Sequence, residues 1–154
     1  MKAKDIMTGA PLTCSPGTNL AAAAALMLDG DCGILPVVDD GKLVGVVTDR
    51  DLFIALGTRD RRASDITIGE VVAEAPVVSS GPDEEIGGVL DRMREHRVRR
   101  VPVVGFGETV LGIVSMNDIV LATKSSRPVA NSALLEALQT ICAHHHPVAR
   151  VAAA

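Results

Sequence analysis

Apolar residues recur with helical spacing in two separate stretches of the chain. In each stretch they follow one another at positions i, i+3, i+4 and i+7, which places them on one face of an α-helix. The positions are Leu20, Ala23, Ala24 and Met27 in the first stretch, and Ile86, Val89, Leu90 and Met93 in the second. Turn residues precede both stretches, and Thr18 and Asp83 are the expected N-caps of the two helices.

Two short apolar runs follow each predicted helix. They are rich in β-branched residues and too short for helices, so they predict strands. The runs cover residues 35–38 and 43–48 in the first half of the chain, and 101–104 and 110–115 in the second. Turns at 39–42 and 105–108 separate the runs, so each pair predicts a β-hairpin. A closing helix is expected to begin near Arg50 and near Asn117.

The two halves are copies of one unit. Residues 6–56 align with 71–123, and no gap in the alignment exceeds one residue. The aligned pairs include Pro36 with Pro102, Gly45 with Gly112, Thr48 with Ser115, and Asp51 with Asp118. Each copy is predicted to be a βαββα unit, and the fold class is α/β (α+β).

The repeat divides the chain into a first copy at 1–57, a linker at 58–69, a second copy at 70–124 and a C-terminal part at 125–154. The linker carries several arginines and is predicted to be polar. In the C-terminal part, apolar residues at helical spacing predict a last helix over 131–143, capped by Asn131 or Ser132. Its apolar face must pack either on the body of the same chain or on a second subunit.

Composition narrows the function classes. The chain has two Phe and no Trp or Tyr, which excludes a nucleic-acid surface built on aromatic stacking, and its net charge of −4 argues against a basic phosphate-binding face. Apolar runs are too short for a membrane span, and the charged N-terminus lacks the apolar core of a signal peptide, so a cytoplasmic protein is expected. Cys14, Cys32 and Cys142 are expected to be free thiols, with a Cys14–Cys32 disulfide as the alternative.

These motifs resemble the CBS domain, a small module first noted in cystathionine β-synthase and found as tandem pairs. The resemblance covers about residues 3–123. The motifs that carry it are Asp5-Ile6-Met7, the strands Leu35-Pro36-Val37-Val38 and Val101-Pro102-Val103-Val104, and the signatures at 45–51 and 112–118. It implies a pseudo-twofold pair packed through its sheets, with a cleft at each end of the interface. It also implies that these clefts bind adenosine-containing ligands and that the chain forms a homodimer.

A hydroxyl residue and an aspartate stand in both copies where a strand gives way to a helix. Thr48 with Asp51, and Ser115 with Asp118, have the spacing of a capping box. The hydroxyl at a helix N-terminus also suits a phosphate, and the resemblance assigns the aspartate to ribose hydroxyls. Two interpretations remain open: helix capping alone, or ligand contact with or without capping.

By resemblance, an adenine ring lies in an apolar slot formed by the first strand of each copy, expected at 12–14 and at 77–79, and by the segment that leads into its Pro-Val-Val strand, at 33–36 and 99–102. For each of these residues taken singly, ordinary core packing is the alternative. The candidate ligand-binding residues are Thr13, Gly33, Ile34, Pro36, Thr48, Asp51, Val78, Arg99, Arg100, Pro102, Ser115 and Asp118.

Arg99 and Arg100 directly precede the second Pro-Val-Val strand. Arginine binds phosphate through its planar fork, although arginines at a helix end are commonly a solvated face. The first copy has Gly33 and Ile34 at these positions, so the arginine-bearing cleft is expected to bind phosphorylated ligands more tightly. Which of the two clefts is occupied stays open.

Catalytic and metal motifs are missing from the sequence. It contains no nucleophile elbow, P-loop or HExxH pattern, so neither an enzyme nor a required cofactor is expected. The His144–His146 run has no Cys or carboxylate cluster around it, so no specific metal site is expected.

The leading hypothesis is a non-catalytic regulatory module, an energy sensor that binds AMP, ADP, ATP or a related adenosine ligand between its copies. With no effector domain attached, it would act on an effector protein in trans. The alternative is a ligand-free interaction module of the same fold that acts through dimerisation.

Overall fold

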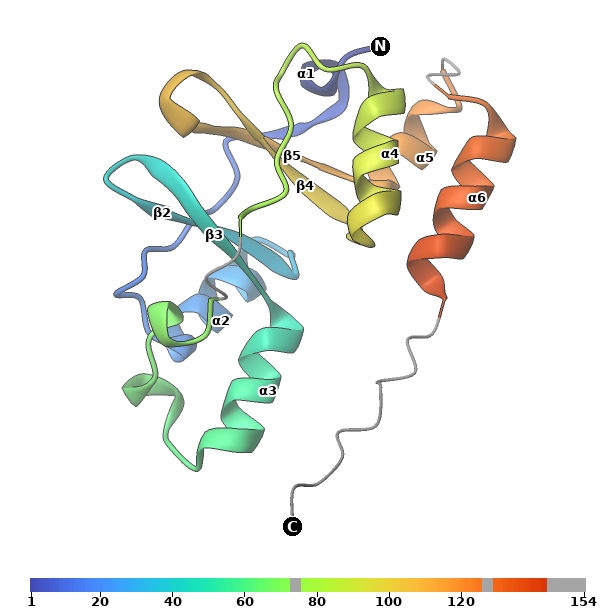
Figure 1. Ribbon diagram of the computed structural model, residues 1–154. Coiled ribbons are helices and arrows are strands. Elements are labelled where there is room, and N and C mark those ends of the chain that lie inside the picture. The colour runs from blue at the N-terminus through green and yellow to red at the C-terminus, as the bar shows by residue number, and fades with distance from the viewer. Residues whose placement is uncertain (73–75, 126–128, 144–154) are drawn as a thin grey trace.

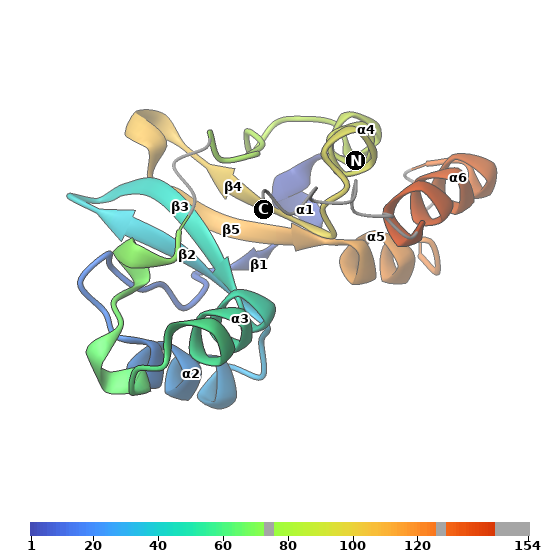
Figure 2. The same ribbon diagram turned by 60° about the horizontal axis from the view of Figure 1, so that its bottom comes forward.

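The structure, a computed structural model, describes residues 1–72, 76–125 and 129–143. Two β-hairpins lie side by side in the middle of the molecule, and helices cover their outer sides (Figure 1 and Figure 2). The first repeat contains α2 (Leu20–Asp29), β2 (Ile34–Asp39), β3 (Lys42–Thr48) and α3 (Asp49–Arg59), and the second contains α4 (Ile86–His96), β4 (Arg100–Val104), β5 (Val110–Ser115) and α5 (Met116–Ala122). The other elements are α1 (Ala3–Ile6), β1 (Thr8–Gly9), the 3-10 helices η1 (Ala63–Asp65), η2 (Ile68–Glu70) and η3 (Phe106–Glu108), and α6 (Asn131–Cys142).

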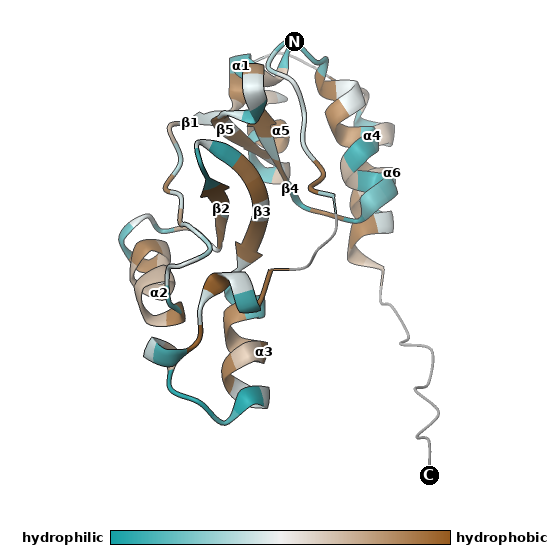
Figure 3. Cartoon of the chain, turned by 60° about the vertical axis from the view of Figure 1, so that its left-hand side comes forward, coloured by the Kyte–Doolittle hydropathy of each residue, from teal (hydrophilic) through white to brown (hydrophobic). Residues whose placement is uncertain are grey.

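Both predicted hairpins are confirmed, and they share one register. β2 pairs antiparallel with β3, starting with Ile34 opposite Thr48, and β4 pairs with β5, starting with Arg100 opposite Ser115. Their strands are apolar along most of their length (Figure 3). Each hairpin has one register irregularity, and the two irregularities fall at equivalent steps, Val37/Val38 and Val103/Val104. The duplication in the sequence is therefore also a duplication of backbone geometry.

The first strand expected in each copy is reduced to a single bridging residue. Cys14 forms a parallel bridge to β2, and Ser80 forms one to β4. The prediction of strands over 12–14 and 77–79 was therefore wrong in extent. A proline stands two residues further along in both copies, and because proline has no N–H to donate, it ends the pairing there.

Thr18 does not cap the first long helix. Asn19 caps α2, because its side chain accepts a hydrogen bond from the Ala22 N–H at 2.9 Å. The Thr18 hydroxyl instead accepts one from the Ser15 N–H at 3.0 Å. Thr and Asn are both favourable N-cap residues, so the sequence alone misplaced the cap by one position.

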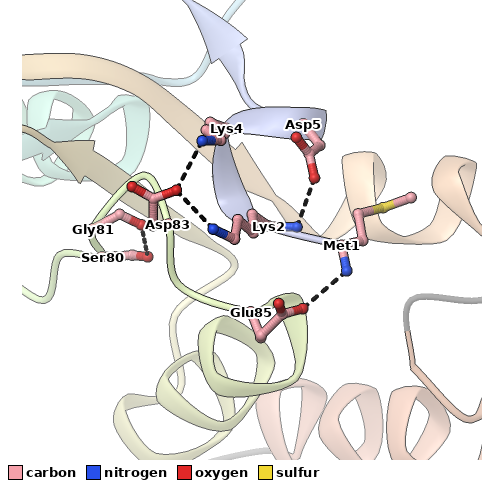
Figure 4. A network of polar contacts seen from close by, with 8 residues as sticks. All are labelled: Met1, Lys2, Lys4, Asp5, Ser80, Gly81, Asp83 and Glu85. Carbon is pink, nitrogen blue, oxygen red and sulfur yellow. Dashed lines mark hydrogen bonds and ion pairs between the residues drawn. The ribbon is translucent and has the colours of Figure 1, made fainter.

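Asp83 does not cap α4 but binds the N-terminal segment of the chain (Figure 4). Its Oδ1 accepts hydrogen bonds from Lys4 Nζ at 2.8 Å and Lys2 Nζ at 2.9 Å. These hydrogen bonds, that of Lys4 first, lower the pKa of Asp83 to about 2. The N-terminal ammonium of Met1 adds an ion pair with Glu85 at 2.9 Å. Carboxylates at the start of α4 therefore hold the beginning of the chain against the second repeat.

Each core is completed by the segment that leads into the other repeat. Ala3 in α1, ahead of the first repeat, is fully buried in the core of the second. Ile66 and Ile68, ahead of the second repeat, are fully buried in the core of the first. The segment 58–69, predicted to be polar, therefore ends in core residues, and the two repeats are interlocked.

Gly45 and Gly112 lie where these segments pass close to the strands β3 and β5. A Cβ at Gly112 would lie 2.8 Å from the backbone oxygen of Thr8 and 2.6 Å from Met7 Sδ. A Cβ at Gly45 would meet the side chain of Val72. At Gly112 the crossing segment also pairs with the strand itself, because β1 lies antiparallel to β5.

The C-terminal helix α6 packs on α4 of its own chain (Figure 2). Ala137 is 1% exposed in the core of the second repeat, and Arg94 of α4 pairs with Glu136 at 3.2 Å. Of the two expected packing partners, the structure shows the body of the same chain. Capping by Asn131 or Ser132 was wrong, because the residue before α6 makes no side-chain cap. No helix in the described ranges is long and apolar enough to cross a membrane.

Candidate functional site

Each hairpin has a core face and an opposite face, because successive side chains of a strand alternate between the two. The residues that face the cores are Leu35, Val37 and Val47 in the first hairpin, and Val101, Val103 and Val114 in the second. The residues that alternate with them are Ile34, Pro36, Val46 and Thr48 in the first hairpin, and Arg100, Pro102, Ile113 and Ser115 in the second. This inter-hairpin face carries many of the predicted ligand-binding residues.

A cleft of about 290 Å³, the first cleft, is built from both repeats. The first half of the chain supplies a mostly apolar wall, and the second supplies a hydroxyl, a carboxylate and a guanidinium. The lining residues are Thr8, Ala10, Pro11, Leu12, Gly30, Cys32 and Ile34 from the first half, and Arg100, Ile113, Ser115 and Asp118 from the second. Apolar walls with a few convergent polar groups are typical of small-molecule sites.

A capping box at the start of α5 fixes Ser115 and Asp118. The backbone N–H and the hydroxyl of Ser115 both donate to Asp118 Oδ2, at 2.7 and 2.6 Å. The Asp118 N–H donates back to Ser115 Oγ at 3.3 Å. Asp118 Oδ1 has no hydrogen-bond partner within the described part of the chain. Capping is therefore confirmed, and contact with a ligand through the second carboxylate oxygen stays a prediction.

Thr48 and Asp51 form the same capping box at α3. The Thr48 N–H and hydroxyl donate to Asp51 Oδ2 at 2.8 and 2.6 Å. Neither residue lines the first cleft. Asp51 borders a separate depression of about 170 Å³ along α3, together with Thr58 and Arg59. The two predicted aspartate sites therefore have equal local geometry and different surroundings.

A second cleft of about 180 Å³ combines the repeats in the opposite way. The slot of this cleft comes from the second repeat. The strand that faces the slot is β3 of the first repeat, which contributes Gly45 and Val46. The lining residues are Gly45, Val46, Val72, Pro76, Val77, Val78, Val98, Arg100 and Pro102. Each cleft therefore joins the slot of one repeat to a strand of the other.

Arg99 and Arg100 lie in different surroundings. Arg100 is exposed and lines both clefts, and its guanidinium makes no hydrogen bond or ion pair with another described residue. Arg99 lines neither cleft, and its guanidinium approaches Cys142 Sγ of α6 at 4.0 Å. Of the two arginines only Arg100 lines a cleft, and its contact with a phosphate stays a prediction.

Three further candidates line neither cleft. Thr13 is exposed, Pro36 is buried, and a Cβ on Gly33 would lie 2.9 Å from Asp49 Oδ2. Sequence reasoning in turn missed Thr8 as a cleft residue. Thr8 reaches the first cleft through the pairing of β1 with β5, and no local pattern in the sequence signals that long-range pairing.

All three cysteines are free, as predicted. Cys14 is buried, which raises the pKa of its thiol to about 11. Cys32 is half-buried in the first cleft, and Cys142 is exposed. Among the residues that the structure describes, no three His, Cys, Asp or Glu side chains come together as a metal site. The His144–His146 run lies outside the described residues.

Comparison with known proteins agrees with the duplication. The CBS domain profile matches residues 3–58 and again 68–125. The Bacillus subtilis protein YlbB is 38% identical over 135 residues, which are 86% of this chain and 88% of YlbB.

Two solved structures share the fold. The CBS domain pair of protein MJ0100, in complex with 5'-methylthioadenosine and S-adenosyl-L-methionine, is 30% identical with a TM-score of 0.72, over 81% of this chain and 97% of that chain. Hypoxic Response Protein I, with two coordinated zinc ions, is 34% identical with a TM-score of 0.71, over 79% of this chain and 98% of that chain.

Proposed function

Because this chain belongs to the CBS domain family, as a tandem pair of CBS domains, we propose that it is a non-catalytic regulatory module that binds an adenosine-containing ligand in the first cleft. The composition of that cleft carries the proposal, since an apolar wall from one repeat faces Ser115, Asp118 and Arg100 of the other. An adenine ring suits the apolar wall, ribose hydroxyls suit the unpaired oxygen of Asp118, and a phosphate suits Arg100.

The relative MJ0100 supports the choice of ligand class. Its CBS domain pair is in complex with two adenosine derivatives whose substituents differ, so adenosine is the part that the two ligands share. A ligand seated between the repeats contacts both and favours the arrangement in which those contacts are best. Through that shift in arrangement, the module would act on an effector protein in trans.

The cysteines provide a direct test of binding in the first cleft. Cys32 lines this cleft and Cys142 lies outside it, so alkylation by iodoacetamide can be followed at both by mass spectrometry. We expect adenosine, AMP, ADP, ATP or S-adenosylmethionine to protect Cys32 and leave Cys142 unchanged. At a ligand concentration of 100 times the dissociation constant, the Cys32 rate should fall about 100-fold, in proportion to the free protein.

The matched controls are guanosine and GMP at the same concentrations, which should protect neither thiol. If none of the adenosine compounds slows Cys32 alkylation or raises the unfolding temperature, the ligand-binding proposal is wrong. Equal protection of both cysteines would place the ligand effect outside the first cleft.

A second function, self-association, is favoured by the closing helices. Phe53 is 77% exposed and Ile54 lies beside it on α3, while Val120 and Leu121 are exposed at the equivalent positions of α5. Exposed apolar patches of this kind mark interaction surfaces. Because the repeat places similar patches on two helices, a second copy of the chain can meet α3 with its own α5, in a closed twofold dimer.

We therefore expect Phe53→Glu to abolish a homodimer. The charge would be buried without a partner in the interface, so the mass from light scattering should fall from twice the chain mass to 16.0 kDa. Phe106→Glu is the control, since Phe106 is fully exposed at the tip of the other hairpin. A wild-type mass of 16.0 kDa at micromolar concentration would contradict the dimer.

A further inference from the structure

Arg100 lies where the two clefts meet. It is the first residue of β4, and its neighbour Val101 is fully buried in the core of the second repeat. Because side chains alternate along a strand, the Arg100 side chain points away from that core, toward the other hairpin. Both clefts lie on that side, and Arg100 belongs to the lining of both.

The repeat supplies no second cation at the equivalent place. Ile34 begins β2 as Arg100 begins β4, and it pairs with Thr48 as Arg100 pairs with Ser115. Ile34 is apolar, 7% exposed, and lines the first cleft. Among the described residues that line the two clefts, Arg100 is therefore the only cation, and one guanidinium must serve two sites.

Nothing within the described chain fixes this guanidinium to one side. The Arg100 guanidinium has no hydrogen bond or ion pair with the described residues, whereas that of Arg94 is paired with Asp91 and Glu136. Asp118, the carboxylate of the first cleft, is bonded through Oδ2 to Ser115 and forms no ion pair with Arg100. The Arg100 fork is thus available to an anion in either cleft, and a bidentate phosphate contact uses the fork completely.

We propose that Arg100 couples the two clefts by being shared between them, so that two phosphorylated ligands compete for it and uncharged ligands do not. The inference rests on the proposed adenosine binding and adds its regulation. The first phosphate to bind takes the guanidinium. A second phosphorylated ligand then has no cation in its own cleft. The negative charge of the first phosphate is nearby and weakens the binding of the second further. The module would hold one anionic nucleotide, or one anionic and one uncharged adenosine compound.

The test is titration calorimetry of the full chain with adenosine and with AMP. For each ligand, the measured quantity is the ratio of the second dissociation constant to the first. We expect this ratio to be about tenfold larger for AMP than for adenosine, within the usual range of coupling between sites. In Arg100→Ile, which copies the residue of the other repeat, the first AMP should bind about 10- to 100-fold more weakly, and the AMP ratio should fall toward the adenosine ratio because only the repulsion between the two phosphates remains.

Arg99→Ile is the matched control. It removes the same charge from the neighbouring residue, whose side chain lines neither cleft. Its AMP and adenosine titrations should match the wild type. Equal ratios for AMP and adenosine in the wild type would overturn the sharing, and so would a single binding event for both ligands. Equal weakening of adenosine and AMP in Arg100→Ile would also overturn it. All three outcomes leave adenosine binding intact, whereas no heat with either ligand would refute the proposed function itself.

Discussion

Gly112→Ala is expected to destabilise the protein by about 2 to 3 kcal/mol, the upper part of the range for an overpacked core. The added Cβ would lie 2.8 Å from the backbone oxygen of Thr8 and 2.6 Å from Met7 Sδ. The methionine side chain can rotate away, but Thr8 is in β1, whose backbone pairs with β5 opposite this glycine. The melting temperature should fall by about 5 to 10 °C for a chain of this size.

Gly57→Ala is the matched control for the glycine substitution. Gly57 lies in α3, and a Cβ there has nothing within 4 Å. Alanine should therefore stabilise the helix by about 0.5 to 1 kcal/mol. Gly45→Ala should cost less than Gly112→Ala, because the added atom meets only the Val72 side chain. Equal melting temperatures for Gly112→Ala and Gly57→Ala would mean that the N-terminal segment is not packed on β5.

The hairpins and the long helices could be predicted from the sequence because their signals are local and occur twice. The short apolar runs at 43–48 and 110–115 can be recognised from neighbouring residues alone, and each copy checks the other. The interlocking of the repeats could not be predicted this way. Ala3 leads into the first repeat and is buried in the core of the second, and Ile68 leads into the second and is buried in the core of the first. No periodicity within either segment indicates which core it enters.

The sequence predicted several residues of the candidate site, but not how the two repeats combine to form it. Ile34, Arg100, Ser115 and Asp118 do meet in one cleft. That Asp118 lies beside the slot of the first repeat could not be predicted, because it depends on how the two hairpins face each other. Arg99 and Arg100 carry the same charge and are both exposed, and only the position of Arg100 as the first residue of β4 places it at the clefts.

The capping boxes provide the most decisive test of the ligand site, because they separate structure from binding. Asp118→Ala and Asp51→Ala remove the same two hydrogen bonds from a strand-to-helix junction. Both should lose about 1 kcal/mol of stability, the usual cost of an N-cap interaction. Only Asp118 lines the first cleft. Loss of a charged hydrogen bond to ribose should weaken adenosine binding about 10- to 100-fold in Asp118→Ala alone.

Calorimetry with adenosine on the two variants gives a distinct result for each role of the aspartates. Unchanged affinity in both would make them caps and nothing more, and the ribose would have to bind elsewhere in the cleft. Equal weakening in both would point to a general effect of helix capping on the fold, since Asp51 lies in a separate depression along α3. A loss of affinity confined to Asp118→Ala cannot be explained by helix capping, because Asp51→Ala removes the equivalent cap. That result would place the ribose at the start of α5.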